Sequence, residues 1–156
     1  MAARSSAVTD TENHELVIKR IFNAPRAMVW KAWTDPEHLM RWWGPHGFTT
    51  TSCKMDVRPG GSWRITMKSP QGREDRQRGV FREVVEPERL IFTYAFEDEA
   101  GNAGHEMIVS VSFAERGEST ELTIHQTQFE TVAVRDDHVR GWNEALDHLA
   151  TLLAKR

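Results

Sequence analysis

Two polar residues, Arg135 and His138, fall on an otherwise apolar helical stripe near the end of the chain. At about 100° per residue, both project within roughly 60° of Trp142, and Leu146 and Leu149 continue the stripe. An imidazole donates or accepts a hydrogen bond and a guanidinium pairs with a carboxylate, so the two could orient a ligand in an apolar pocket. A purely structural interpretation stays open, with the Arg135 charge reaching solvent and His138 bonded to a strand hydroxyl.

The spacing of the other candidate groups does not favour a metal or a nucleophile. His138 and His148 are ten residues apart, which places them about 80° out of alignment on a helix. His38 and His46 flank a Trp-Trp-Gly-Pro turn with no cysteine or carboxylate at ligand spacing. The run 59–61, Pro-Gly-Gly, predicts a hairpin turn rather than a phosphate loop, and no nucleophile elbow is present. We therefore expect no metal, no cofactor and no catalytic residues.

The elements that would position a site follow from hydrophobic periodicity. Alternation of apolar and polar residues predicts antiparallel strands, and period 3.6 predicts a long amphipathic helix over about 131–154. Four of the six tryptophans occur within the stretch 30–43, in two short helices that begin near Pro25 and Pro36, with Asp35 as the second N-cap. The predicted strands cover 15–22, 48–57, 63–68, 80–85, 90–96, 107–113 and 120–128.

Length and composition fit one globular domain. A chain of 156 residues can bury a core without disulfides, and we expect a flexible N-terminal tail over 1–13 followed by one domain over 14–156. The net charge of −3, without a Lys/Arg run, argues against nucleic-acid binding. No apolar run reaches the roughly 18 residues of a membrane span, and the single Cys53 fits a reducing compartment, so we expect a cytoplasmic protein. A homodimer stays open.

These elements predict an α+β fold in which a curved antiparallel sheet of about seven strands carries two short helices and a long C-terminal helix over its concave face. An aromatic-rich sheet face must be covered, and the terminal helix is the element long enough to cover it. A curved sheet gripping a helix often leaves a gap between the two layers.

Several motifs resemble one known family. The segments that carry the resemblance are 23–45 (Asn-Ala-Pro…Val-Trp-Lys-Ala-Trp-Thr-Asp-Pro-Glu…Trp-Trp-Gly-Pro), 58–63 (Arg-Pro-Gly-Gly-Ser-Trp), 86–90 (Glu-Pro-Glu-Arg-Leu) and 138–142 (His-Val-Arg-Gly-Trp). In this order they resemble SRPBCC proteins of the START/Bet v 1-like superfamily, in the group named after the C-terminal domain of the heat-shock-protein-90 ATPase activator. The resemblance implies the helix-grip fold. It implies no single function, since the family includes ligand carriers and cyclases.

We expect a non-catalytic protein that binds a small hydrophobic molecule between sheet and C-terminal helix. One alternative is a cyclase- or hydratase-like enzyme that uses the same pocket, with His138 as acid or base. Another is a protein-interaction module of co-chaperone type, which requires an exposed tryptophan surface. The predicted ligand-binding residues are Trp30, Trp42, Trp63, Met67, Phe92, Tyr94, Met107, Val109, Arg135, His138, Trp142 and Leu146.

Overall fold

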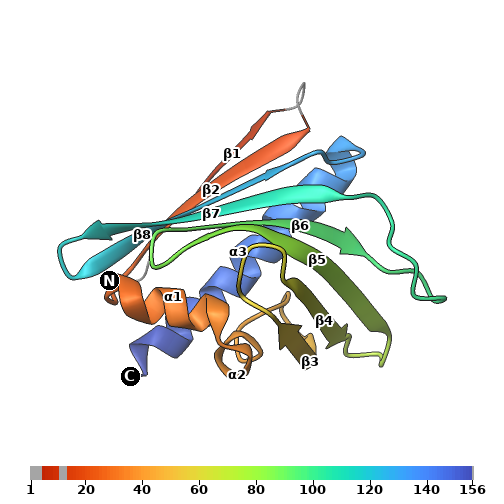
Figure 1. Cartoon of the computed structure of the whole chain (residues 1–156), viewed down its shortest axis with the longest axis horizontal. Helices are drawn as coiled ribbons and strands as arrows, with labels where there is room; N and C mark the ends of the chain where they lie inside the picture. The colour runs from red at the N-terminus through yellow and green to blue at the C-terminus, as the bar shows by residue number, and fades with distance from the viewer. Residues whose placement is uncertain (1–4, 11–13, 156) are drawn as a thin grey trace.

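A single eight-stranded antiparallel sheet and a long helix make up the body of the protein (Figure 1). The computed structural model describes residues 5–10 and 14–155. The strand order is β1-β2-β8-β7-β6-β5-β4-β3. This architecture confirms the predicted helix-grip α+β fold. The strands are β1 (Ser5–Asp10), β2 (Glu15–Phe22), β3 (Thr49–Met55), β4 (Ser62–Lys68), β5 (Glu74–Val85), β6 (Arg89–Phe96), β7 (Met107–Arg116) and β8 (Ser119–Thr127).

The strand β1 departs from the sequence-based expectation. Residues 1–13 are predicted as a loose tail, yet Ser5–Asp10 pair antiparallel with β2 from Ser5↔Arg20 to Asp10↔Glu15. This raises the strand number from about seven to eight. Backbone hydrogen bonds to the free edge of β2 stabilise such a strand without any side-chain periodicity, so the pattern gave no signal. The rest of the predicted tail, residues 1–4 and 11–13, lies outside the described residues.

The two short helices form where the prolines predict them. Helix α1 (Arg26–Thr34) follows Pro25, and α2 (Pro36–Leu39) begins at a proline whose missing N–H costs nothing in a first turn. The Asp35 carboxylate caps α2 by accepting a hydrogen bond from the backbone N–H of Glu37 at 3.0 Å. Trp30 of α1 packs edge-to-face on Phe113 of β7, with ring centroids 5.3 Å apart, which fixes α1 against the sheet.

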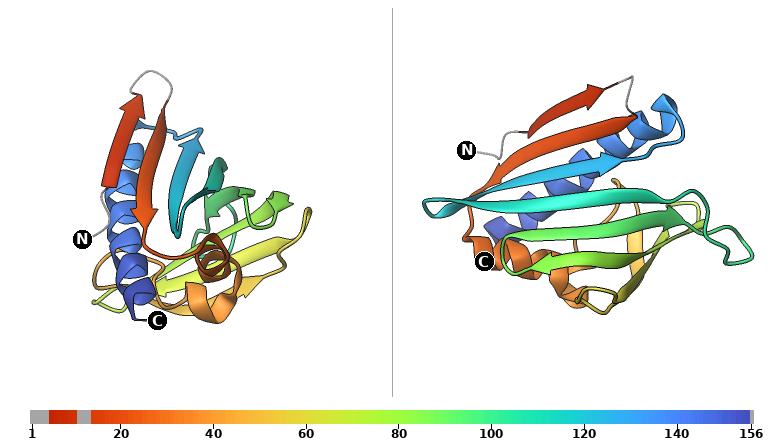
Figure 2. Two further views of the ribbon diagram at one scale, coloured as in Figure 1. Left: turned by 90° about the vertical axis from the view of Figure 1, so that its left-hand side faces the viewer. Right: turned by 45° about the horizontal axis from the view of Figure 1, so that its top comes forward.

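Helix α3 (Val132–Ala154) runs diagonally across the sheet (Figure 1, Figure 2). The hydroxyl of Thr131 caps it by accepting from the N–H of Val134 at 3.1 Å. Its apolar stripe is buried as predicted, since Trp142, Leu146, Leu149 and Leu153 are at most 7% exposed. Among the described residues, no helix is long and apolar enough to cross a membrane.

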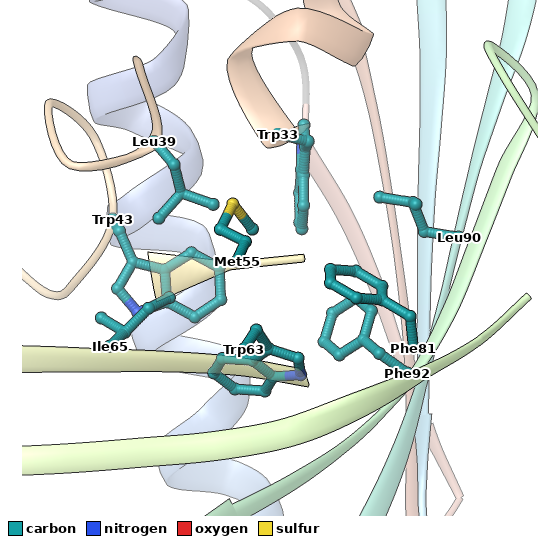
Figure 3. A pocket seen from close by; sticks show the side chains of 9 residues that line it. All are labelled: Trp33, Leu39, Trp43, Met55, Trp63, Ile65, Phe81, Leu90 and Phe92. Carbon is teal, nitrogen blue, oxygen red and sulfur yellow. The ribbon is translucent and has the colours of Figure 1, made fainter. Parts of the chain in front are cut away.

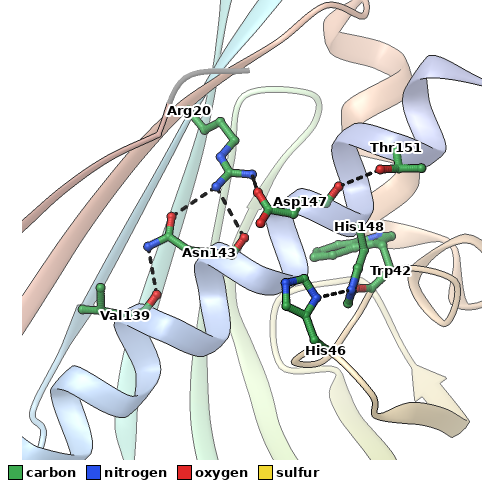
Figure 4. A network of polar contacts seen from close by, with 8 residues as sticks. All are labelled: Arg20, Trp42, His46, Val139, Asn143, Asp147, His148 and Thr151. Carbon is green, nitrogen blue, oxygen red and sulfur yellow. Dashed lines mark hydrogen bonds and ion pairs between the residues drawn. The ribbon is translucent and has the colours of Figure 1, made fainter. Parts of the chain in front are cut away.

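A buried arginine links helix α3 to strand β2 (Figure 4). Arg20 of β2 donates from Nη1 to Asp147 Oδ1 at 2.8 Å and from Nη2 to Asn143 Oδ1 at 3.2 Å. The guanidinium is only 4% exposed, whereas the Asp147 carboxylate faces solvent. Charge-assisted bonds to a guanidinium hold position better than neutral ones, so this network fixes how far α3 stands from the sheet.

Candidate ligand-binding site between the sheet and the C-terminal helix

A cavity of about 270 Å³ lies between strands β4–β6, helix α3 and the loop after α2. Part of its wall is aromatic, because inward positions of β6 and the apolar stripe of α3 both carry rings. It is lined by Trp43, Gly44, Pro45, Met67, Arg73, Asp75, Gln77, Tyr94, Phe96, Asp137, His138, Arg140, Gly141, Trp142 and Ala145. Small-molecule sites usually combine apolar and aromatic walls with polar groups that orient the ligand, and this cavity has both kinds of side chain.

Charged residues mark where the cavity meets solvent. Arg73, Asp137 and Arg140 are exposed, and each cation has a carboxylate beside it. Arg140 Nη2 lies 3.5 Å from Asp137 Oδ1, and Arg73 Nη2 lies 3.9 Å from Asp75 Oδ2. The four formal charges cancel, so the mouth is polar but carries no net charge.

Two buried glutamines hold the tryptophans of the cavity wall. Trp43 Nε1 donates to Gln77 Oε1 at 3.0 Å, and Trp142 Nε1 donates to Gln126 Oε1 at 2.8 Å. Both glutamine amides point their nitrogen at a methionine sulfur, Gln77 toward Met67 and Gln126 toward Met107. The two indoles meet edge-to-face with centroids 5.2 Å apart. Since a buried indole N–H needs a partner, these bonds fix the orientation of both rings.

His138 lines this cavity, and its ring keeps one hydrogen-bond acceptor unpaired among the described residues. Its Nδ1 lies 2.9 Å from the carbonyl oxygen of Val134, which only accepts, so Nδ1 carries the proton. Burial lowers the pKa of His138 below its usual 6.5, against smaller opposing effects of the Val134 carbonyl and Asp137. The ring is therefore neutral at neutral pH, with its lone pair on Nε2. Nε2 is buried and has no hydrogen-bond partner among the described residues.

Tyr94 places the second polar group of the inner wall. Its ring is buried, and its centroid lies 5.7 Å from that of His138 in an edge-to-face arrangement. Burial, and then the charge of Asp75, raise the pKa of Tyr94, because both disfavour the phenolate. The hydroxyl thus stays protonated and keeps the ability to donate.

The comparisons with known proteins agree with this fold. A family model described as "Activator of Hsp90 ATPase homolog 1-like protein" matches residues 23–154. The chain belongs to this family. The resemblance drawn from the sequence motifs is thereby confirmed. A comparison with curated proteins finds no match.

Solved structures of bacterial proteins share the fold of this family member over nearly its whole length. A protein from Arthrobacter aurescens is 27% identical, with a TM-score of 0.85, and the match covers 97% of this chain and 92% of the other. A protein from Mycobacterium smegmatis is 25% identical with a TM-score of 0.83, covering 95% of each chain. A protein from Chromobacterium violaceum is 28% identical with a TM-score of 0.79, covering 90% of this chain and 96% of the other.

In this member of the activator-homologue family, the cavity brings together four of the residues predicted from the sequence. Met67 of β4, Tyr94 of β6, and His138 and Trp142 of α3 line it. The other eight lie elsewhere: Trp30, Trp42, Met107, Val109 and Leu146 are buried in packed core, Trp63 and Phe92 line a separate void, and Arg135 is buried at the start of α3.

The separate void is too small to hold a ligand (Figure 3). It measures about 20 Å³, about the space of one water molecule. Apolar side chains such as Trp63, Phe81 and Phe92 enclose it, so it offers a water nothing to bond to. Arg135 is not a cavity residue either, since its Nη2 and Nε donate to Asp136 Oδ1 at 2.9 and 3.1 Å. Its buried Nη1 has no hydrogen-bond partner in the part of the chain that the structure describes.

Three cavity features were missed from the sequence. Trp43 lines the cavity where its neighbour Trp42 was predicted, and Trp42 instead donates from Nε1 to the Ala32 carbonyl at 2.9 Å. Gln77 and Gln126 hold the indoles but were not singled out. A signal for Gln126 was present, because it continues the inward alternation of Leu122 and Ile124 on β8.

Proposed function

We propose that this protein binds a small, largely apolar molecule in the cavity between β4–β6 and α3. The observation that carries the proposal is a cavity of about 270 Å³ whose wall includes the aromatic side chains of Trp43, Tyr94, Phe96 and Trp142. The charged side chains at the mouth are paired with one another, so neither cation is left without a carboxylate beside it.

A residue at the mouth offers a way to test the site. Gly141 lines the cavity, and a Cβ built there meets only Pro45 Cγ, at 3.9 Å. Gly141→Leu therefore places an isobutyl group at the mouth without a backbone clash and within a helix that favours leucine over glycine. Ala133→Leu, at an exposed position of the same helix, is the matched control.

The experiment titrates the full-length protein with 2-methoxynaphthalene, followed by calorimetry and by quenching of tryptophan emission. We expect saturable one-to-one binding that quenches emission, because Trp43 and Trp142 form the wall. Gly141→Leu weakens binding at least tenfold, and Ala133→Leu leaves it unchanged. Absence of binding to the wild-type protein by this probe and by other naphthalenes contradicts the proposal.

Acid–base catalysis in the same cavity is a second candidate. The observation that favours it is that a neutral imidazole and a protonated phenol both line the cavity, with ring centroids 5.7 Å apart. Turnover that is lost in both His138→Phe and Tyr94→Phe, with binding retained, would establish it. Binding without turnover by the wild-type protein supports the carrier function instead.

A protein-interaction role through tryptophans is not supported. All six tryptophans are buried, none more than 7% exposed. The exposed tryptophan surface that this alternative requires is therefore not formed, because the rings pack on each other and on the sheet.

A further inference from the structure

Two histidines that are far apart in the sequence meet at an exposed position outside the cavity (Figure 4). Nδ1 of His46, in the loop after α2, lies 2.8 Å from Nε2 of His148 on α3. The ring centroids are 4.8 Å apart and the ring planes meet at 63°. Spacing along the chain does not reveal this pair, because the fold alone brings together residues 102 positions apart.

The bonds around His148 turn one nitrogen lone pair toward His46. Nδ1 of His148 faces the carbonyl oxygen of Trp42 at 3.3 Å, and since a carbonyl only accepts, the proton of His148 is on Nδ1 and the lone pair on Nε2. Histidines that ligate metals usually donate their other ring N–H in this way, which fixes the tautomer and the ring orientation. His46 is exposed, so the proton that its Nδ1 shares with His148 can move to Nε2 of the same ring. Two neutral nitrogen ligands then face each other.

A carboxylate lies beside the pair. Glu144 precedes His148 by four residues on α3, so both lie on the same side of the helix. Its Oε1 accepts the backbone N–H of His46 at 2.9 Å, which places a negative charge next to the two neutral rings. The described residues contain no group of three His, Cys, Asp or Glu side chains that could hold a metal ion. An ion held by the pair therefore keeps water in its other positions, and Glu144 offsets part of its charge.

The donor atoms determine which ions fit. Imidazole nitrogen suits Zn²⁺ and Cu²⁺, whereas Mg²⁺ and Ca²⁺ prefer oxygen. Zinc–nitrogen bonds are about 2.0–2.1 Å long, so two nitrogens on a tetrahedral ion stand about 3.3 Å apart. The distance of 2.8 Å between the two nitrogens is about 0.5 Å shorter, and rotation of the exposed His46 ring supplies this difference.

We propose that His46 and His148 form a site for Zn²⁺ or Cu²⁺, in which the ion replaces the proton that the two rings share. The ion then joins the loop after α2 to helix α3 by two coordinate bonds in place of one hydrogen bond. Since Trp43, Gly44 and Pro45 of this loop line the cavity, the ion also braces one cavity wall.

The test is a calorimetric titration of the full-length protein, free of any purification tag and treated with EDTA, with ZnCl₂ at pH 7.5. We expect one saturable Zn²⁺ site and no binding of MgCl₂. His46→Phe and His148→Phe each weaken Zn²⁺ binding at least about tenfold, because one imidazole alone remains. His125→Phe, which removes a histidine on β8, is the matched control and leaves the Zn²⁺ affinity unchanged.

NMR of the wild-type protein gives an independent readout. Zn²⁺ moves the ring ¹⁵N resonances of His46 and His148 and leaves those of the other five histidines in place. It also slows solvent exchange of the Phe48 amide, which is bonded within the loop to Pro45.

Several results would overturn the inference: no saturable Zn²⁺ site, a site of unchanged affinity in both His46→Phe and His148→Phe, or shifts confined to other histidines. An unchanged exchange rate of the Phe48 amide in Zn²⁺-saturated protein would overturn the bracing of the loop. Should the two variants not fold, the wild-type resonances decide. Because neither histidine lines the cavity, these results are independent of the proposed function.

Discussion

The Nδ1 atom of His46 and the Nε2 atom of His148 lie 2.8 Å apart and join the loop after α2 to helix α3 (Figure 4). His148 Nδ1 faces the carbonyl oxygen of Trp42 at 3.3 Å, which assigns the His148 proton to Nδ1 and makes His46 the donor to Nε2. The backbone N–H of His46 also donates to Glu144 Oε1 at 2.9 Å. Since Trp43, Gly44 and Pro45 of this loop line the cavity, these bonds hold one cavity wall on α3.

The first prediction concerns this contact. His148→Phe removes the acceptor for His46 and the donor to Trp42, and we expect the amide of Phe48, bonded within the loop to Pro45, to exchange with solvent about 2- to 10-fold faster. Hydrogen exchange measured by NMR reads this out. His125→Phe, which alters a histidine on β8, is the control and leaves the rate unchanged. An unchanged rate in His148→Phe would show that the loop is held without the imidazole pair.

The second prediction is a pH dependence of stability that originates at His138. Burial lowers the pKa of His138 in the folded protein below the 6.5 of the unfolded chain. As the pH falls through 6.5, the unfolded state takes up a proton that the folded state does not, so the free energy of unfolding decreases. The contribution is fully present above pH 6.5 and is lost progressively toward the lower, folded-state pKa.

The measurement is urea denaturation between pH 5 and 7.5 on wild-type protein and on His138→Phe. We expect the variant to lose less stability over this range than the wild type, because its buried ring cannot be protonated. The other six histidines are common to both proteins, so the difference between the two curves reports His138 alone. Parallel curves would contradict the prediction.

The fold was predictable because local signals and burial agree in this chain. The alternation of Met107, Val109 and Val111 gives an inward face that the structure buries completely or nearly so, and Asp35 caps α2 as its side chain dictates. Strand β1 was not predicted from the sequence, because pairing at the edge of a sheet uses backbone groups and leaves no pattern in the side chains.

The site was predictable only in part, because periodicity tells which face of an element is inward but not where two inward faces separate. Met67 and Val109 both face α3's side of the sheet, yet only Met67 borders the cavity, while Val109 is packed in core. Likewise, adjacent tryptophans at 42 and 43 diverge by about 100°, and nothing local decides which one reaches the cavity. That choice depends on tertiary bonds such as the one from Trp43 to Gln77.

The third prediction tests the aromatic centre of the core. Trp142 stacks on Trp33 at 5.8 Å, meets Trp43 edge-to-face and donates to Gln126. Trp142→Ala removes all three contacts, and we expect the free energy of unfolding to fall by about 3–5 kcal/mol, the usual cost of losing a buried large aromatic. Arg140→Ala, at an exposed site two residues away, should change it by less than about 0.5 kcal/mol. Equal effects of the two substitutions in urea denaturation would show that the stripe of α3 contributes little packing.

The last prediction contrasts two glycines that respond oppositely to the same added methyl group. At Gly79 of β5, a Cβ would lie 1.8 Å from the carbonyl oxygen of Thr93 and 2.5 Å from Trp63 Nε1, which itself donates to that carbonyl at 3.1 Å. The Thr93 oxygen belongs to the backbone of β6 and cannot turn aside. Gly79→Ala must therefore push two strands apart or break the Trp63 bond, and we expect a loss of at least about 1–3 kcal/mol, the usual cost of overpacking.

At Gly141 the nearest atom to an added Cβ is Pro45 Cγ, at 3.9 Å, an ordinary van der Waals contact. Gly141 lies inside α3, where glycine costs about 1 kcal/mol relative to alanine through the freedom that it retains in the unfolded chain. We therefore expect Gly141→Ala to stabilise the protein by about 0.5–1 kcal/mol. Thermal and urea denaturation of both variants give the comparison, and since each substitution adds one methyl group, a shift of the same sign in both would contradict the geometric argument.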